Sequence, residues 1–382
     1  MAPPPPPPLP ELMEELIEEI LLRLPPSDPA SLVRAALVSA PWCRIVSGAA
    51  FRCRFRAFHG TAPLLGFLCD PMMVQHDLWD GVLVPTSSAF RPREPFACRR
   101  PLDARHGRVL FQERSSNYRL HVWDPITDAW ITLPEMLDDY PDIDCWTAAV
   151  LCAAAATGEC DHLDCHDEPF TVVVVGSDQN EEEMFSYVYS SESGRWSEPT
   201  YAVCPNDFIS WWDRSVLMGN ALYFKFYMNN RILKYDLGTR EMTMMDLPRY
   251  EENDNDPSSS VHNIQLMTTE GGRRLGFVRL EQSRLCLWSR DDEADVGWAL
   301  NRVIELEKLL PFDRSLPWCT FLLGFAEGVG VIFMCVVDGV FTVDLKSSKV
   351  MKVHEGSINT VVPYMSFRTP GTDLGTMTIF FK

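Results

Sequence analysis

The sequence predicts a mainly β protein, in which a small N-terminal three-helix module precedes a β-propeller of about six or seven blades. Two observations carry this prediction. Before residue 60, apolar side chains recur with helical spacing, whereas after residue 62 β-branched and aromatic runs are separated by Gly, Asn, Asp and Pro turns. The expected parts are a disordered Pro-rich leader at residues 1–11, the helical module with a connecting helix at 12–60, and the propeller at 61–382.

The composition argues against two classes of partner. The formal net charge is −19, and affinity for nucleic acid depends on clustered Lys and Arg. The most apolar stretch, Ser315 to Phe341, is interrupted by Glu327 and Asp338, so no membrane-spanning segment is expected. Twelve cysteines without the spacing of a disulfide framework indicate a reducing compartment. We therefore expect a chain of the cytoplasm, the nucleus or both, with no nucleic-acid partner, no membrane partner and no cofactor.

The first predicted helix begins at Leu12 and is amphipathic. Glutamates occupy one side of it near its start, where they complement the helix dipole. Pro25 and Pro26 end it, because the residue before a proline is pushed out of the α region. The other side is apolar and consists of Leu12, Leu16, Ile17, Ile20, Leu21 and Leu24.

Two further short helices are predicted from proline at a helix start. Asp28-Pro29 and Ser39-Ala40-Pro41 each place a capping residue before a proline that suits the first turn. Leu32 and Trp42 then supply apolar positions. Three short helices in 36 residues (12–47) cannot bury all this apolar surface against one another, so a partner or the rest of the chain must cover some of it.

The segment from Leu16 to Pro26, followed by Leu32, Val38-Ser39 and Trp42, resembles an F-box. One position departs from that pattern, since Leu12-Met13 stands where F-boxes commonly have Leu-Pro. The resemblance implies binding to the Skp-family adaptor of Skp/cullin/F-box ubiquitin ligases and, through the adaptor, to cullin. The residues expected to contact the adaptor are Leu12, Leu16, Ile17, Ile20, Leu21, Leu24, Pro25, Leu32, Val38 and Trp42.

Residues 51–58 predict a helix that connects the module to the propeller. Phe51 and Phe55 have the spacing of neighbours on one helix face. Arg52, Arg54 and Arg56 alternate with Phe51, Phe55 and Phe58, but three arginines beside an acidic domain favour a solvated edge over a nucleic-acid patch.

The clearest propeller blade is predicted at Arg214 to Pro248. Four apolar runs there are separated by the turns Gly219-Asn220, Asn229-Asn230 and Gly238-Thr239. Four antiparallel strands in 35 residues make one blade. Related units lie at 107–134, 170–199, 262–306 and 320–353, with third strands near residues 122, 188, 287 and 342. A first blade is expected from Leu64 to Pro101.

One of these units carries a second resemblance. Trp123-Asp124 precedes the last strand of its unit and continues into Pro-Ile-Thr, so it is not a WD-repeat motif. With Trp130 and Leu133-Pro134 it is similar to the strand-turn-strand of plant F-box-associated propellers. The two resemblances imply a plant, grass-type F-box protein that holds an unknown target on its propeller as the non-catalytic substrate-recognition subunit of the ligase.

Other chemistry has little support in the sequence. Cys160, His162, Cys165 and His166 are zinc-competent, but their spacing is tight and the segment lacks the paired second half of a zinc knuckle. An acidic surface loop without metal is the preferred interpretation. The motifs of hydrolases and phosphate loops are missing from the sequence, so no catalytic residue is predicted. The alternatives are a propeller scaffold that acts without cullin and, with less support, a propeller hydrolase.

Overall fold

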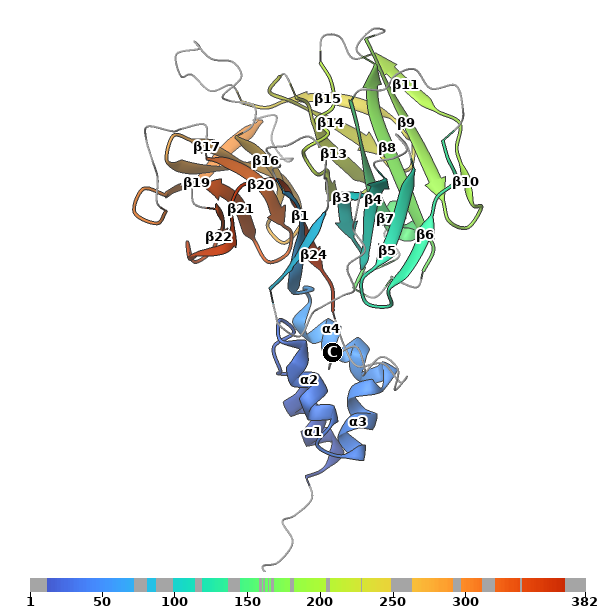
Figure 1. Cartoon of the computed structure of the whole chain (residues 1–382), viewed down its shortest axis with the longest axis vertical. Helices are drawn as coiled ribbons and strands as arrows, with labels where there is room; N and C mark the ends of the chain where they lie inside the picture. The colour runs from blue at the N-terminus through green and yellow to red at the C-terminus, as the bar shows by residue number, and fades with distance from the viewer. Residues whose placement is uncertain are drawn as a thin grey trace, which may run out of the picture. The chain divides into compact units, whose positions relative to one another are not determined.

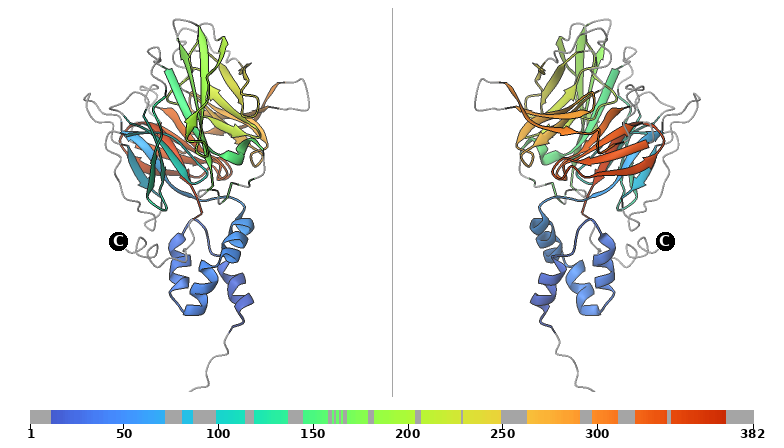
Figure 2. Two further views of the ribbon diagram at one scale, coloured as in Figure 1. Left: turned by 90° about the vertical axis from the view of Figure 1, so that its right-hand side faces the viewer. Right: turned by 90° about the vertical axis from the view of Figure 1, so that its left-hand side faces the viewer.

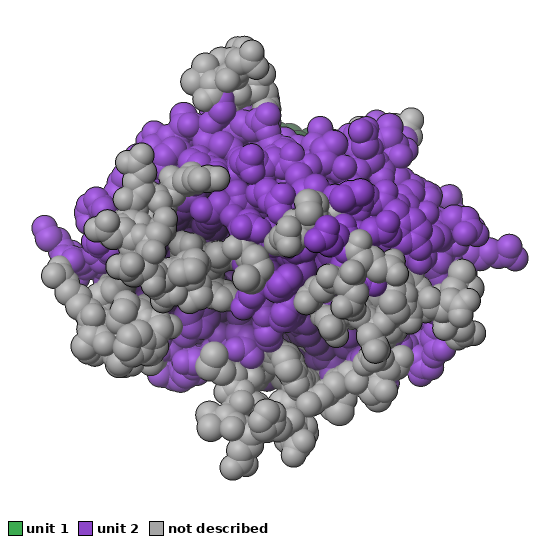
Figure 3. All heavy atoms as spheres, turned by 90° about the horizontal axis from the view of Figure 1, so that it is seen from above, with its two compact units in different colours: residues 1–63, 87–91, 367–382 green, residues 64–86, 92–366 purple. Residues whose placement is uncertain are grey.

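The computed structural model describes two compact units, coloured separately in Figure 3. Unit 1 contains the α-helices, and unit 2 contains the strands and one short 3-10 helix. Among the described residues no helix combines the length and the apolar character that crossing a bilayer requires. The described residues are 12–71, 81–86, 99–113, 119–136, 145–157, 160, 162–163, 165, 168–178, 182–203, 207–227, 229–248, 263–290, 297–310, 320–336 and 339–367. The predicted leader at 1–11 lies outside them.

Unit 1 contains the three predicted helices and the connecting helix, and α3 packs against the other three (Figure 1). The regular part of the first helix is shorter than predicted. It ends at Leu21, and residues 22–24 form a turn that precedes Pro25. The four helices are α1 (Glu14–Leu21), α2 (Pro29–Ala36), α3 (Ala40–Ser47) and α4 (Ala49–His59).

The two predicted helix caps differ in outcome. Ser39 caps α3 as expected, because its hydroxyl accepts a hydrogen bond from the backbone N–H of Trp42 at 3.4 Å. The prediction for Asp28 is wrong, since its side chain makes no cap hydrogen bond to α2. The Asp28 carboxylate instead accepts hydrogen bonds from the Ser31 hydroxyl at 2.6 Å and from the Arg34 guanidinium at 3.0 Å. A carboxylate beside a cation and a hydroxyl is satisfied without backbone donors.

Helix α4 has the aromatic pair that its spacing predicts. The rings of Phe51 and Phe55 are stacked with centroids 5.8 Å apart, and both residues are buried. The Phe55 ring also meets the edge of Phe367 at 6.2 Å. Phe367 therefore belongs to unit 1, which differs from the predicted boundary that placed everything after residue 60 in the propeller.

The described strands of unit 2 form six sheets, so the propeller has six blades (Figure 1). Five of them correspond to the five predicted units. The third strands, β5, β9, β14, β18 and β22, lie where the repeat predicted them. Blade 1 contains β3 (Arg99–Arg105), β4 (Arg108–Glu113), β5 (Leu120–Asp124) and β6 (Ala129–Thr132). Blade 2 contains β7 (Cys145–Cys152), β8 (Phe170–Asp178), β9 (Glu183–Ser190), β10 (Arg195–Trp196) and β11 (Thr200–Val203), with the 3-10 helix η1 (Ala153–Ala156) after β7.

The other three predicted units are regular four-stranded blades. Blade 3 contains β12 (Val216–Met218), β13 (Ala221–Lys225), β14 (Arg231–Asp236) and β15 (Met242–Asp246). Blade 4 contains β16 (Ile264–Thr269), β17 (Arg274–Glu281), β18 (Arg284–Arg290) and β19 (Trp298–Glu305). Blade 5 contains β20 (Phe321–Ala326), β21 (Val331–Val336), β22 (Gly339–Asp344) and β23 (Val350–Glu355).

The sixth sheet, here called the closing blade, joins the two ends of the propeller. Its strands are β1 (Leu64–Pro71), β2 (Val82–Pro85) and β24 (Ile358–Met365), in the order β2-β1-β24. The predicted first blade, Leu64 to Pro101, is therefore wrong in extent, because β24 completes it and Pro101 belongs to blade 1. Strand β24 also contacts β3 and β20, so the closing blade lies between blade 1 and blade 5 and closes the ring (Figure 2).

From blade 1 to the closing blade, each blade shares a hydrophobic core with the next one. In β7, Ala148 and Val150 belong to the core with blade 1, whereas Ala149 and Leu151 belong to the core with blade 3. Successive side chains of a strand point to opposite faces of the sheet, so one strand feeds both cores. This explains why every residue of β7 is buried and why the inner runs read as continuous apolar sequence.

A repeated turn follows the third strand in three blades. Asp124, Asp236 and Asp344 each end that strand, and the carboxylate accepts hydrogen bonds from the backbone N–H groups two and three residues later. The residue four positions on has a positive φ in every case. These donors, led by that of the third residue, hold the pKa of Asp236 and of Asp344 below its ordinary value. The Trp-Asp-Pro segment thus belongs to a turn motif of this propeller.

Candidate functional site

The helical unit buries only part of its apolar surface. Ile17 and Leu21 of α1, Leu32 of α2, Val46 of α3 and Phe55 of α4 are all buried, and together they form the interior of the unit. A unit this small can bury only a limited fraction of its apolar surface in its own core. Of the fifteen large apolar residues that stay exposed in the described chain, seven lie between residues 12 and 59.

Helix α1 carries the most continuous part of this exposed surface. Met13, Leu16 and Ile20 are 65%, 46% and 51% exposed. Leu16 and Ile20 are four residues apart, so they lie one above the other on one face of the helix, and Met13 stands at its N-cap. Leu12, just before the helix, is 55% exposed. We call these four residues the α1 face.

A second exposed pair follows α2. The helix ends at Ala36, and Leu37 and Val38 are 56% and 65% exposed in the turn before Ser39. Both are large aliphatic side chains, and neither belongs to the buried interior. An exposed patch of this kind on a small unit is typical of a protein-binding surface.

Ion pairs fix α1 against α4. The guanidinium of Arg54 lies 2.7 Å from a carboxylate oxygen of Glu18 and 2.8 Å from one of Glu19. The hydrogen bond from Arg23, together with Arg54, holds the pKa of Glu19 below its ordinary value. A ring nitrogen of His59 also lies 3.0 Å from the carbonyl oxygen of Leu22. These contacts orient the helix that carries the α1 face.

The residues predicted to contact the adaptor fall into three groups. Leu24 and Trp42 are half-buried, whereas Ile17, Leu21 and Leu32 lie in the interior of the unit and are not available to a partner in this conformation. Periodicity alone could not separate these residues from the exposed ones, because neighbouring stripes of a helix are equally apolar. It also missed Met13 and Leu37, which join the exposed set. The exposed predicted residues are Leu12, Leu16, Ile20, Pro25 and Val38.

The weak metal candidates of the sequence also come together. Cys160, His162 and Cys165 lie close to one another in the segment between β7 and β8, and His166 lies outside the described residues. Cys152, the last residue of β7, is the fourth member of the group. Sequence reasoning missed Cys152 because it considered only a seven-residue window (160–166).

The fold is a closed six-bladed propeller joined to a small helical unit with an exposed apolar helix face. Residues 101–370 match the family model described as "F-box protein AT5G49610-like, beta-propeller". This match covers more than half of the chain, and the chain belongs to that family.

Further similarities include one curated relative and two solved structures. The F-box/kelch-repeat protein At3g61590 of Arabidopsis thaliana is 27% identical over 236 residues, which is 56% of this chain and 51% of the relative. The match therefore spans about half the length of that protein. A nidogen/laminin complex chain has a TM-score of 0.43 at 10% identity and covers 78% of this chain and 97% of its own. A functionally unknown protein from Desulfotomaculum acetoxidans has a TM-score of 0.41 at 9% identity, covering 78% and 89%.

Proposed function

We propose that this chain is the substrate-recognition subunit of a Skp/cullin/F-box ubiquitin ligase. The α1 face carries the proposal, because it is an apolar helical surface that unit 1 leaves uncovered. Membership of an F-box propeller family and the F-box-like spacing from Leu16 to Pro26 support the same partner. The adaptor covers the α1 face together with Pro25 and Val38, and cullin is recruited through the adaptor.

Burial of this face by a partner makes a measurable contribution to the affinity. Complete burial of a Leu or Ile side chain is worth about 1.5–3 kcal/mol. Leu16 and Ile20 are about half exposed, so together they still offer about 1.5–3 kcal/mol to a partner. Every 1.4 kcal/mol is about a tenfold change in affinity. These two residues alone therefore contribute about 10- to 100-fold in affinity.

The propeller binds the target protein in this proposal, and the chain itself carries out no covalent step. The ligase accelerates ubiquitin transfer because target and ubiquitin-charged enzyme are held in one assembly at high effective concentration. The chain acts in the cytoplasm, the nucleus or both. Proximity labelling with and without proteasome inhibition identifies the target by its accumulation on the propeller.

The direct test replaces both half-exposed residues of the α1 face. The double variant Leu16→Asp/Ile20→Asp puts two carboxylates into the apolar contact, and an unpaired charge there is costly. We expect at least a 100-fold loss of affinity for a Skp-family adaptor, measured by calorimetry with the full chain. The fold should survive, because Ile17 and Leu21 keep the interior of the unit.

The matched control is Met351→Asp on β23, where the native residue is 51% exposed, as Ile20 is. This variant should bind the adaptor as the wild type does. Equal affinities of the double variant and the wild type would remove the α1 face from the interface. A pull-down of cullin through the adaptor separates the ligase from a propeller scaffold, since the scaffold recovers adaptor without cullin.

A further inference from the structure

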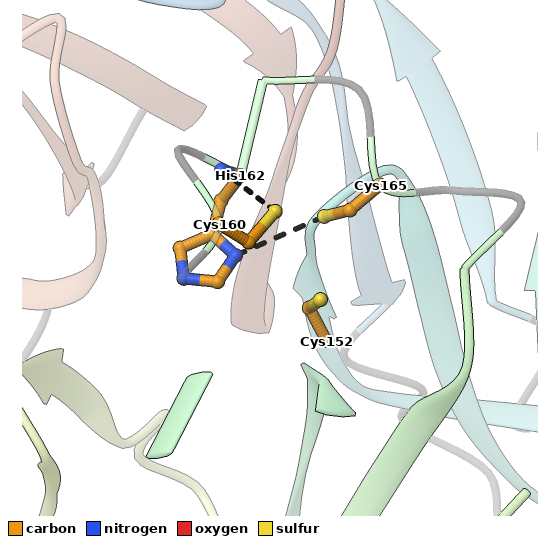
Figure 4. A group of neighbouring side chains, drawn as sticks. All are labelled: Cys152, Cys160, His162 and Cys165. Atoms are coloured by element: carbon orange, nitrogen blue, oxygen red, sulfur yellow. Dashed lines mark hydrogen bonds between the residues drawn. The ribbon is translucent and has the colours of Figure 1, made fainter. Parts of the chain in front are cut away.

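The segment between β7 and β8 brings four metal-binding side chains to one point (Figure 4). Cys152 ends β7, and Cys160, His162 and Cys165 follow at spacings that leave seven, one and two residues between them. The four ligand atoms all lie within 4.8 Å of one another. The Cys165 Sγ and the His162 Nδ1 are 3.8 Å apart.

We propose that Cys152, Cys160, His162 and Cys165 bind one zinc ion in a tetrahedral Cys3His site. With Zn–S bonds of about 2.3 Å and Zn–N bonds of about 2.0 Å, the edges of such a tetrahedron are about 3.5–3.8 Å. The Cys165–His162 edge already has this length. The longest edge needs to shorten by about 1 Å, which rotation about χ1 of two cysteines provides.

The donor set selects the ion. Three thiolates and one imidazole favour zinc over calcium or magnesium, which prefer oxygen ligands. Four protein ligands leave no open position, so the site is structural and not catalytic. Residues 160–166 supply three of the four ligands, and Cys152 at the end of β7 supplies the fourth one.

Two backbone features hold the ligands in place. The N–H of Ala153 donates to the carbonyl of Pro169 at 2.9 Å, which closes the base of the segment next to Cys152. The N–H of His162 donates to the Cys160 Sγ at 3.3 Å, and His162 has a left-handed φ of 58°. An N–H donor on sulfur stabilises the thiolate that a metal needs. A non-glycine residue in this region of φ marks a constrained turn.

A second histidine supports the ligands from outside. The Nδ1 of His106 accepts a hydrogen bond from the backbone N–H of Cys152 at 2.9 Å. Its ring is stacked on His162 with centroids 4.0 Å apart and an angle of 14°. His106 therefore positions Cys152 through a hydrogen bond to its backbone and His162 through the stacked ring plane.

The composition of the segment explains why an ion would be needed. Residues 157–169 read TGECDHLDCHDEP, with Leu163 as the one large aliphatic residue. Hydrophobic burial cannot pay for ordering such a segment. Metal binding supplies folding free energy instead, because the ligands come together only when the segment is folded.

The test measures zinc in the full chain, purified without a metal-binding tag from zinc-supplemented cells. We expect about one zinc per chain by mass spectrometry of the metal, and at least a tenfold lower ratio in Cys165→Ala. The matched control is Cys145→Ala, which removes a buried thiol from the other end of the same strand and should keep the zinc. The variant His106→Ala should weaken zinc binding by about 10- to 100-fold.

A second measurement does not depend on the folding of a variant. Wild-type protein stripped with a chelator is titrated with cobalt(II), and a tetrahedral thiolate site gives intense visible bands that saturate at one equivalent. Zinc then displaces the cobalt and abolishes the bands. Less than a tenth of an equivalent of zinc together with no visible cobalt bands would overturn the proposal. A mass lower by two hydrogens, which reports a disulfide within the group, would also overturn it.

Discussion

The sharpest stability prediction concerns Asp103, a carboxylate with no exposed surface at the inner end of blade 1. It accepts hydrogen bonds from the backbone N–H of Ala104 at 2.9 Å and of Val150 at 3.0 Å. It also lies 2.5 Å from the guanidinium groups of Arg105 and Arg214. One side chain therefore ties β3 to β7 of blade 2 and to the segment that leads into blade 3. The perturbation is Asp103→Ala.

The expected cost follows from what the variant leaves behind. Arg105 is 4% exposed and Arg214 is 12% exposed, so both keep a charge that water cannot reach well. Burial lowers the pKa of Arg105, and the carboxylate of Asp103 opposes this shift. Removing one partner of a buried ion pair typically costs about 3–5 kcal/mol. Asp103→Asn keeps an acceptor but loses the charge, and should fall between Asp103→Ala and the wild type.

Thermal unfolding converts this cost into a shift of the midpoint. Unit 2 has about 300 residues. At about 2.1 cal/mol/K per residue its unfolding entropy is about 0.6 kcal/mol/K, so a cost of 3–5 kcal/mol lowers the Tm by about 5–8 °C. The control is Glu355→Ala, which removes an exposed ion pair with Lys352 and should shift the Tm by less than about 1 °C. If Asp103→Ala melted within a degree of Glu355→Ala, the inner ion cluster would not hold the blades together.

Three further predictions concern single positions. A Cβ on Gly324 of β20 would lie 2.7 Å from the carbonyl oxygen of Val361 in β24, so Gly324→Ala should destabilise the propeller by about 1–3 kcal/mol in urea unfolding. The control is Gly238→Ala, whose Cβ would meet only side-chain atoms at 3.3 Å or more and which should cost under about 0.5 kcal/mol. Asp344 has a lowered pKa, so its contribution to the stability of the fold is complete at neutral pH and is lost as pH falls through that pKa. Asp344→Asn should therefore be less stable than the wild type at pH 7 by under about 1 kcal/mol and equally stable in acid, which calorimetry across pH checks. Phe55→Ala should cost the helical unit about 3–5 kcal/mol and leave the melting of the propeller unchanged, so a shift of both transitions would contradict it.

Local sequence patterns predicted the elements whose stability is local. The Ser39 cap and the five repeated blades both depend on contacts within a few tens of residues. The end of α1 was placed three residues too late, because Leu22 to Leu24 continue the apolar pattern but form a turn before the prolines. A hydrophobic pattern reports which side faces inward and not where the hydrogen bonds of the helix stop.

Contacts between distant residues could not be predicted in the same way. The pairing of Leu64 with Met365 in the closing blade joins strands from opposite ends of the propeller, and no turn between them signals it. The group around Cys152 was missed for a related reason, since a strand residue and a segment that returns beside it share no periodicity. Asp28 shows the opposite error, because a locally favoured cap lost to a cation, Arg34, six residues away.

Helix α1 shows how one amphipathic pattern can serve two surfaces. Ile17 and Leu21 are buried, whereas Leu16 and Ile20 stand one residue before each of them and are about half exposed. A step of one residue turns the helix by about 100°, so the two pairs form separate stripes on the same helix. The inner stripe holds the unit together, and the outer stripe leaves about half of its surface uncovered. Stability and partner binding can therefore be changed independently here, and a loss of adaptor binding without a change in melting identifies the outer stripe as an interface.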